Sequence, residues 1–108
     1  MFLGKVVGSV WATKKTQNLE GLRFLIVHPY DLNKEPNTNV VVVADRLGAG
    51  IGEIVICAYG KAARSAMGDQ ELSIEAAVVA IVDEVDIDAA ACQSEGVIKA
   101  ARSLKPNL

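Results

Sequence analysis

Three glycines at alternate positions lie between two apolar runs in the middle of the chain, and this spacing constrains the fold more than any other stretch. Residues 45–57 read DRLGAGIGEIVIC. Glycine allows positive φ and close backbone approach, and a phosphate-binding loop uses both where a helix begins at the loop. Residues 53–59 are instead rich in β-branched and aromatic side chains, which is typical of a strand. The third glycine also comes one position early for GxGxxG, and neither GKS nor GKT follows, so the stretch predicts a tight turn between strands.

The composition favours one soluble domain that associates with other subunits. The chain has 108 residues, of which 51% are hydrophobic. That fraction is high for a soluble domain of this size, so we expect another subunit to cover part of the apolar surface. The 11 basic and 13 acidic residues are mixed along the chain, which gives no electrostatic footprint for nucleic acid or for an anionic membrane.

The same composition indicates a cytoplasmic protein. No apolar run approaches the roughly 18 residues of a membrane span, and the first residues do not resemble a signal peptide. Cys57 and Cys92 lie far apart without a CxxC pattern, so neither a disulfide framework nor a zinc site is indicated.

Five segments have the composition of strands and are separated by turn residues. They are residues 2–13, 22–28, 40–44, 53–59 and 74–87, the last being the longest. Five short strands joined by tight turns predict a small closed barrel or a sandwich. We therefore expect a mainly all-β fold, a small five-stranded antiparallel β-barrel that is OB-like, with glycines 4 and 8 allowing the first strand to bend.

Two helices are expected in addition. Residues 61–67 are rich in alanine, and Gly68 can take the left-handed cap position, so a short helix is predicted between the fourth and fifth strands. The tail, residues 89–108, has apolar residues at helical spacing and predicts a possible C-terminal helix. We expect a β-barrel domain over residues 1–88, followed by this tail.

The residue pattern offers little catalytic chemistry. The only histidine, His28, precedes Pro29 at a strand end, where a surface or interface role is more typical than catalysis. Cys57 alternates with apolar neighbours and is expected to be a buried or interfacial thiol. The carboxylates of residues 83–88 lack the ligand order of a calcium loop and are interpreted as a solvated face. We expect no catalytic residue, no cofactor and no metal.

One basic pair could contact an anion. Lys61 and Arg64 open the predicted short helix, where free amides and the helix dipole favour negative charge. The alternatives are that both side chains face solvent, or that Arg64 pairs with a carboxylate across a subunit boundary.

Several short sequences occur in an order that resembles a known family. They are LGKVVGSV at 3–10, DRLGAGIGE at 45–53, GKAAR at 60–64 and AAVVAIVD at 76–83. Over about residues 1–87 the chain resembles the vertex proteins of bacterial microcompartments, the EutN/CcmL family. At Ile54, Lys61 and Ala80 this chain carries residues other than those often found in the family. These differences affect the expected packing and pore chemistry more than the expected fold.

The resemblance implies a structural role in the cytoplasm. It implies a homopentamer of small β-barrels that closes the five-fold vertices of a carboxysome- or metabolosome-type shell, beside hexameric shell proteins and without catalysis. Because glycine turns permit close approach around an axis, we expect the turn to contact neighbouring subunits. The turn residues meant are Asp45, Gly48, Ala49, Gly50 and Gly52. Lys61 and Arg64 would then lie near a central pore.

Two other function classes stay open at this point. An OB-like module that binds a small ligand or nucleic acid would share the strand count, but it would need exposed aromatic residues and a basic groove. A small enzyme would rest on His28 or Cys57 alone. The sequence does not indicate which enzymes a shell would enclose.

Overall fold

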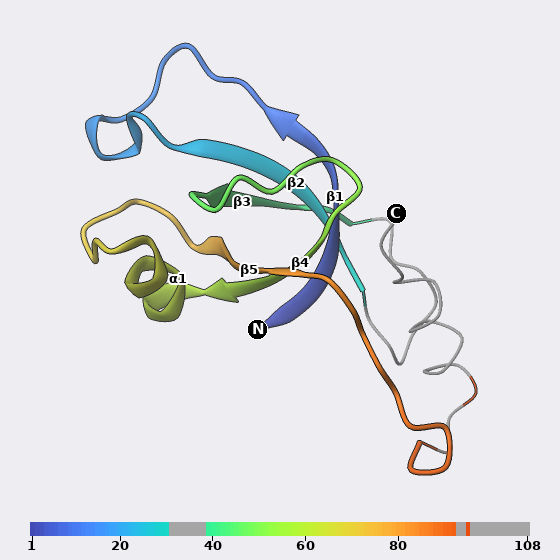
Figure 1. Cartoon of the computed structure of the whole chain (residues 1–108). Helices are drawn as coiled ribbons and strands as arrows, with labels where there is room; N and C mark the ends of the chain where they lie inside the picture. The colour runs from blue at the N-terminus through green and yellow to red at the C-terminus, as the bar shows by residue number, and fades with distance from the viewer. Residues whose placement is uncertain (31–38, 93–94, 96–108) are drawn as a thin grey trace.

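The fold is a five-stranded barrel with one helix packed against its outer surface (Figure 1). The computed structural model describes residues 1–30, 39–92 and 95. The elements are β1 (Phe2–Val10), a 3-10 turn η1 (Gln17–Leu19), β2 (Arg23–Pro29), β3 (Val41–Asp45), β4 (Ile54–Tyr59), α1 (Gly60–Met67) and β5 (Ala76–Val82). The predicted mainly all-β barrel and the predicted short helix between the fourth and fifth strands are confirmed.

The strands close the barrel in the order β1-β2-β3-β5-β4. Four of the pairings are antiparallel, but β3 and β5 run parallel, with Ala44 opposite Ala77. This parallel pair departs from the expected fully antiparallel barrel. Parallel neighbours need a long crossover connection, and here the chain from β3 through β4 and α1 provides it. The glycine turn consequently joins two strands, β3 and β4, that are not neighbours in the sheet.

β1 is a long, curved strand because small residues allow it to approach β2 closely. A Cβ atom added at Gly4 would lie 2.4 Å from a methyl carbon of Val27 and 3.0 Å from the carbonyl oxygen of His28. The pairing with β2 shifts between Val6 and Gly8, which indicates a bulge, and a bulge bends its strand. β1 ends at Val10, three residues before the predicted end.

β5 is shorter than the sequence predicts. It spans Ala76–Val82 rather than residues 74–87, and β1, with nine residues, is the longest strand among the described residues. Val82 pairs with Ile54, the first residue of β4, so no strand of the described part of the chain continues beside the residues that follow. The chain therefore leaves the barrel after Val82 (Figure 1).

Two apolar clusters stabilise the protein. The first fills the barrel and contains Val6, Leu25, Val27, Val43, Ala49, Val55, Cys57, Ala76 and Val78. The second lies between the barrel wall and α1 and contains Leu22, Ala44, Ala58, Ala63, Met67, Leu72, Ile74 and Ala77. Ala44, Ala77 and Ala58 are opposite one another across β3, β5 and β4. Their small side chains allow α1 to lie close to the sheet.

The helix ends as its sequence predicts. Gly68 adopts a left-handed conformation with φ of 83°, and its amide donates to the carbonyl oxygen of Ser65 at 3.0 Å, which satisfies an end carbonyl of the helix. Most of the predicted C-terminal helix lies outside the described residues. Among the residues that are described, no helix is long and apolar enough to cross a membrane.

Candidate functional site

Asp45 ends β3 and is buried at the base of the glycine turn, with 3% of the residue exposed. Its Oδ1 accepts a hydrogen bond from the amide of Leu47 at 2.9 Å. Its Oδ2 accepts from the amides of Gly48 at 3.2 Å and Ala49 at 2.9 Å. Arg23 of β2 places Nη1 3.2 Å from the same Oδ2 atom. These donors satisfy the carboxylate, as a buried charge requires.

The remainder of the turn is bonded to its own barrel. Gly48 and Gly52 have φ values of 84° and 92°, which residues other than glycine rarely adopt. The amide of Gly50 donates to Oε1 of Glu53 at 2.6 Å. The amide of Gly52 donates to the carbonyl oxygen of Val6 at 2.8 Å, and the amide of Val6 donates to the carbonyl oxygen of Glu53 at 2.9 Å. The turn is thus a rigid loop that the first strand holds in place.

The predicted contact of this turn with other subunits stays a prediction. Ala49 is fully buried in the core of its own barrel, so its side chain is not available to a neighbour. Leu47 and Ile51 are the exposed apolar side chains of the turn, at 53% and 71%. Sequence reasoning placed Asp45 at an interface and missed its capping role, although an aspartate just before a glycine turn is a known turn signal.

The structure separates the roles of the two basic residues in α1. Lys61 is exposed, whereas Arg64 donates through Nη1 to the carbonyl oxygen of Ile74 at 3.3 Å. The helix begins at Gly60, whose amide donates to the carbonyl oxygen of Glu75 at 2.7 Å. A Cβ atom added at Gly60 would lie 3.4 Å from Oε1 of Glu75, so a carboxylate already lies near the helix start. Contact with an anion or a pore stays a prediction.

The candidate nucleophile and base are unsuited to act together. Cys57 is fully buried, and desolvation together with the charge of Asp45 raises the pKa of its thiol to about 12, so it is protonated at neutral pH. Its predicted burial is confirmed. His28 stacks on Tyr30, with ring centroids 6.2 Å apart, and burial raises the pKa of the Tyr30 hydroxyl. No group of three potential metal ligands occurs within the described ranges.

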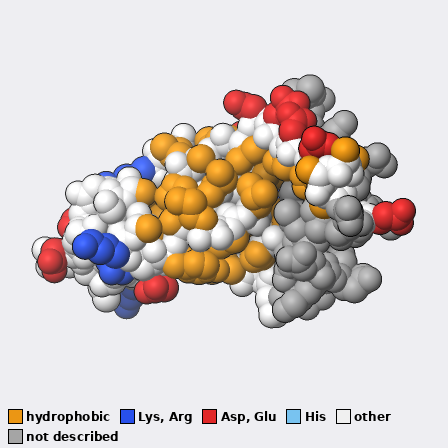
Figure 2. Space-filling model, turned by 90° about the horizontal axis from the view of Figure 1, so that it is seen from below, with side chains coloured by type: hydrophobic (Ala, Val, Ile, Leu, Met, Phe, Trp, Pro, Cys, Tyr) orange, Lys and Arg blue, Asp and Glu red, His pale blue; other side chains and the backbone are white. Residues whose placement is uncertain are grey.

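One side of the barrel is apolar on its outer surface. Leu3 of β1 is opposite Ile56 of β4, and Ile56 is opposite Ala80 of β5. All three are half-buried in the protomer. Alternation along β1 and β4 points Leu3 and Ile56 away from the barrel interior, and Ala80 lies beside Ile56 because the register between β4 and β5 shifts between Ile56 and Cys57. Figure 2 shows a broad band of hydrophobic side chains on this side. We define Leu3, Ile56 and Ala80 as the outer apolar row.

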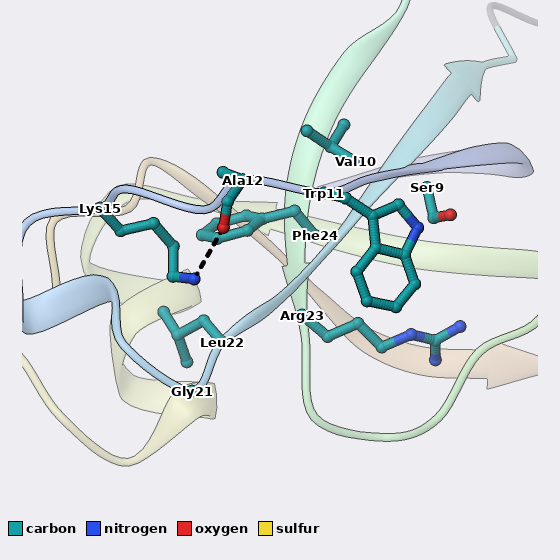
Figure 3. Close-up of a pocket in the computed structure, with 9 residues that line it drawn as sticks. All are labelled: Ser9, Val10, Trp11, Ala12, Lys15, Gly21, Leu22, Arg23 and Phe24. Atoms are coloured by element: carbon teal, nitrogen blue, oxygen red, sulfur yellow. Dashed lines mark hydrogen bonds between the residues drawn. The ribbon is translucent and has the colours of Figure 1, made fainter.

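A pocket of about 390 Å³ lies where β1 ends and β2 begins, and we call it the Trp11 pocket (Figure 3). Trp11 and Arg23 lie at one end of it and Lys15 at the other, while Phe24 lines it between them. Trp11 is 91% exposed, and Nζ of Lys15 donates to the carbonyl oxygen of Ala12 at 3.1 Å. Sequence analysis missed this pocket because it extended the first strand past Trp11.

The family model described as "Ethanolamine utilisation protein EutN/carboxysome" matches residues 1–83. The chain is 44% identical over 86 residues to the bacterial microcompartment shell vertex protein GrpN of Rhodospirillum rubrum, covering 80% of this chain and 97% of that protein. It is 40% identical over 87 residues to the carboxysome shell vertex protein CcmL of Synechocystis, covering 81% and 87%.

Solved structures share the fold. The GrpN pentameric microcompartment shell protein from Rhodospirillum rubrum has a TM-score of 0.71 at 42% identity, covering 82% of this chain and all of that one, 100%. The CcmL structure of Gloeobacter violaceus has a TM-score of 0.75 at 34% identity, covering 82% and 91%.

Proposed function

The chain belongs to the EutN/CcmL family, and from this membership we propose that it is a structural protein that forms homopentamers at the five-fold vertices of a bacterial microcompartment shell. The observation that carries the proposal is the likeness, over nearly the whole barrel, to a relative described as a pentameric shell protein. The relatives are named as shell vertex proteins, and the role we propose is accordingly structural and not enzymatic. The OB-like binding module is not favoured.

The surface of the barrel supports an assembly. A ring of identical subunits uses a head-to-tail interface in which two different surfaces meet. The outer apolar row, Leu3, Ile56 and Ala80, is half-buried in the protomer and would lose its remaining contact with water at such an interface. Leu47 and Ile51 would present the glycine turn to a neighbour, with Asp45 holding the loop in shape.

The proposed setting has two further parts. We place the pentamer in a cytoplasmic shell, where hexameric shell proteins would surround it. We also propose that Lys61, which is exposed, lies closer to any central opening than Arg64, because the guanidinium of Arg64 is engaged by the carbonyl oxygen of Ile74.

Native mass spectrometry of the purified full chain tests the proposal. Five copies in the assembly are expected. A protein that stays a monomer or dimer at high concentration would contradict the vertex function.

A further inference from the structure

The segment that leaves the barrel after β5 combines negative charge with apolar side chains. Residues 83–88, here called the acidic segment, read DEVDID. Their four carboxylates belong to exposed residues, whereas Val85 and Ile87 are half-buried. Among the described residues the one ion pair joins Arg23 to Asp45. The carboxylates of the acidic segment therefore form no ion pair with a described lysine or arginine.

The Trp11 pocket has the complementary chemistry. Its apolar surface comes from the exposed indole of Trp11 and the ring of Phe24, and its positive charge from Lys15 and Arg23. Arg23 remains half-exposed even though it pairs with Asp45. An exposed tryptophan next to cations is typical of an anchor for a partner segment, since aromatic residues and arginine dominate the energetics of interfaces.

The two features of one chain lie on opposite sides of the barrel. In Figure 1 the end of β1 lies above the barrel, whereas the chain after β5 runs away from it on the lower side. The acidic segment therefore cannot reach the pocket of its own protomer. A head-to-tail ring brings one surface of each subunit against a different surface of the next. In such a ring the acidic segment of one subunit can meet the Trp11 pocket of its neighbour.

We propose that the acidic segment of each subunit binds the Trp11 pocket of a second copy of this chain. Val85 and Ile87 would pack against Trp11 and Phe24, while the neighbouring carboxylates face Lys15 and Arg23. The inference rests on the homopentamer proposed above and assigns it a charged contact in addition to the apolar one.

Trp11 is the only tryptophan in the chain, so its fluorescence reports on the pocket directly. In the full-length wild-type assembly we expect emission typical of a covered indole and weak quenching by acrylamide, a neutral quencher that charge substitutions do not attract or repel. The double variant Glu84→Gln/Asp86→Asn should shift emission to longer wavelength and increase quenching. Because exposed ion pairs contribute modestly, each lost pair should change the ratio of bound to free segment by about twofold to fivefold.

Two matched controls isolate the charge contact. Glu20→Gln/Glu71→Gln removes the same charge from exposed residues elsewhere and should leave Trp11 covered. Lys15→Gln should expose Trp11 as the acidic variant does, whereas Lys14→Gln, an adjacent exposed lysine outside the pocket lining, should not. Added salt should expose Trp11 in the wild type and have less effect on the acidic variant.

The outcomes separate the two proposals when native mass spectrometry is run on the same samples. A wild-type pentamer in which acrylamide quenches Trp11 as strongly as a solvent-exposed indole would overturn this inference and leave the vertex function standing. A pentamer in which Trp11 stays covered in both the Glu84/Asp86 and the Lys15 variants would assign the pocket to another occupant and also overturn it. A monomer would overturn the vertex function and, with it, the contact between copies.

Discussion

Arg23 and Asp45 form an ion pair with unequal exposure: the Nη1–Oδ2 distance is 3.2 Å, and the side chain of Arg23 is 49% exposed whereas that of Asp45 is fully buried. The carboxylate faces the glycine turn and organises its amides. Arg23 also lines the Trp11 pocket. One ion pair thereby connects the glycine turn to the lining of the Trp11 pocket.

The substitution Asp45→Ala is expected to destabilise the protein by roughly 3 kcal/mol or more, because each buried donor left without an acceptor costs about 1–3 kcal/mol. Urea unfolding at a fixed protomer concentration measures the change. Glu20→Gln, which alters an exposed carboxylate, should stay within about 0.5 kcal/mol of the wild type. Equal stability of the two variants would show that Asp45 does not hold the turn.

The substitution Gly4→Ala should destabilise the protein by about 1–3 kcal/mol, as overpacking of a tight contact typically does. The added Cβ would lie 2.4 Å from Val27. Gly8→Ala is the matched control on the same strand, since its Cβ would meet Ile26 at an ordinary 3.5 Å. Thermal or urea unfolding compares them, and a larger loss at Gly8 would refute the close approach of β1 and β2 at Gly4.

The substitution Ile56→Glu should dissociate the assembly and leave the barrel folded. Ile56 is half-buried on the outer surface of β4, so a carboxylate there can reach water in the monomer but would be buried without a partner at an interface. Native mass spectrometry and far-ultraviolet circular dichroism measure the two properties. Ile56→Leu is the control and should retain five copies, while a pentameric Ile56→Glu variant would exclude this row from the interface.

The Cys57 thiol should resist a thiol reagent at neutral pH in the native protein, because it is buried and its pKa is raised to about 12. Half-exposed Cys92 should react first, and Cys57 should react only after denaturant has unfolded the protein.

The raised pKa of Cys57 also makes the free energy of unfolding depend on pH. The folded state retains the thiol proton more strongly than the unfolded state, whose ordinary value is 9.0, so this contribution to stability is present below about pH 9 and is lost as pH rises towards 12.

Titration of the thiol content with and without denaturant measures the first effect, and urea unfolding between pH 8 and pH 11 measures the second. The Cys57→Ser variant should lose the thiol-dependent part of the alkaline decrease. Rapid modification of both thiols in the native state would contradict the burial of Cys57.

Local pattern determined the elements of this protein. The five strand segments and the helix were predictable because β-branched runs, glycine turns and the Gly68 cap act within a few residues of one another. The fold class and the burial of Cys57 followed from the same patterns. The order of LGKVVGSV, DRLGAGIGE and GKAAR carried the family, since these sequences lie in the part of the chain that the family model matches.

Only the tertiary structure decided how those elements meet. β5 pairs in parallel with β3 and stops where β4 begins, because strand ends depend on a neighbour that is distant in sequence. The capping role of Asp45, the burial of Ala49 and the engagement of Arg64 by Ile74 depend in the same way on which backbone atoms the folded chain brings within reach. Sequence periodicity shows which side of a strand is apolar. Which segment packs against that side depends on contacts between residues that are distant in the sequence.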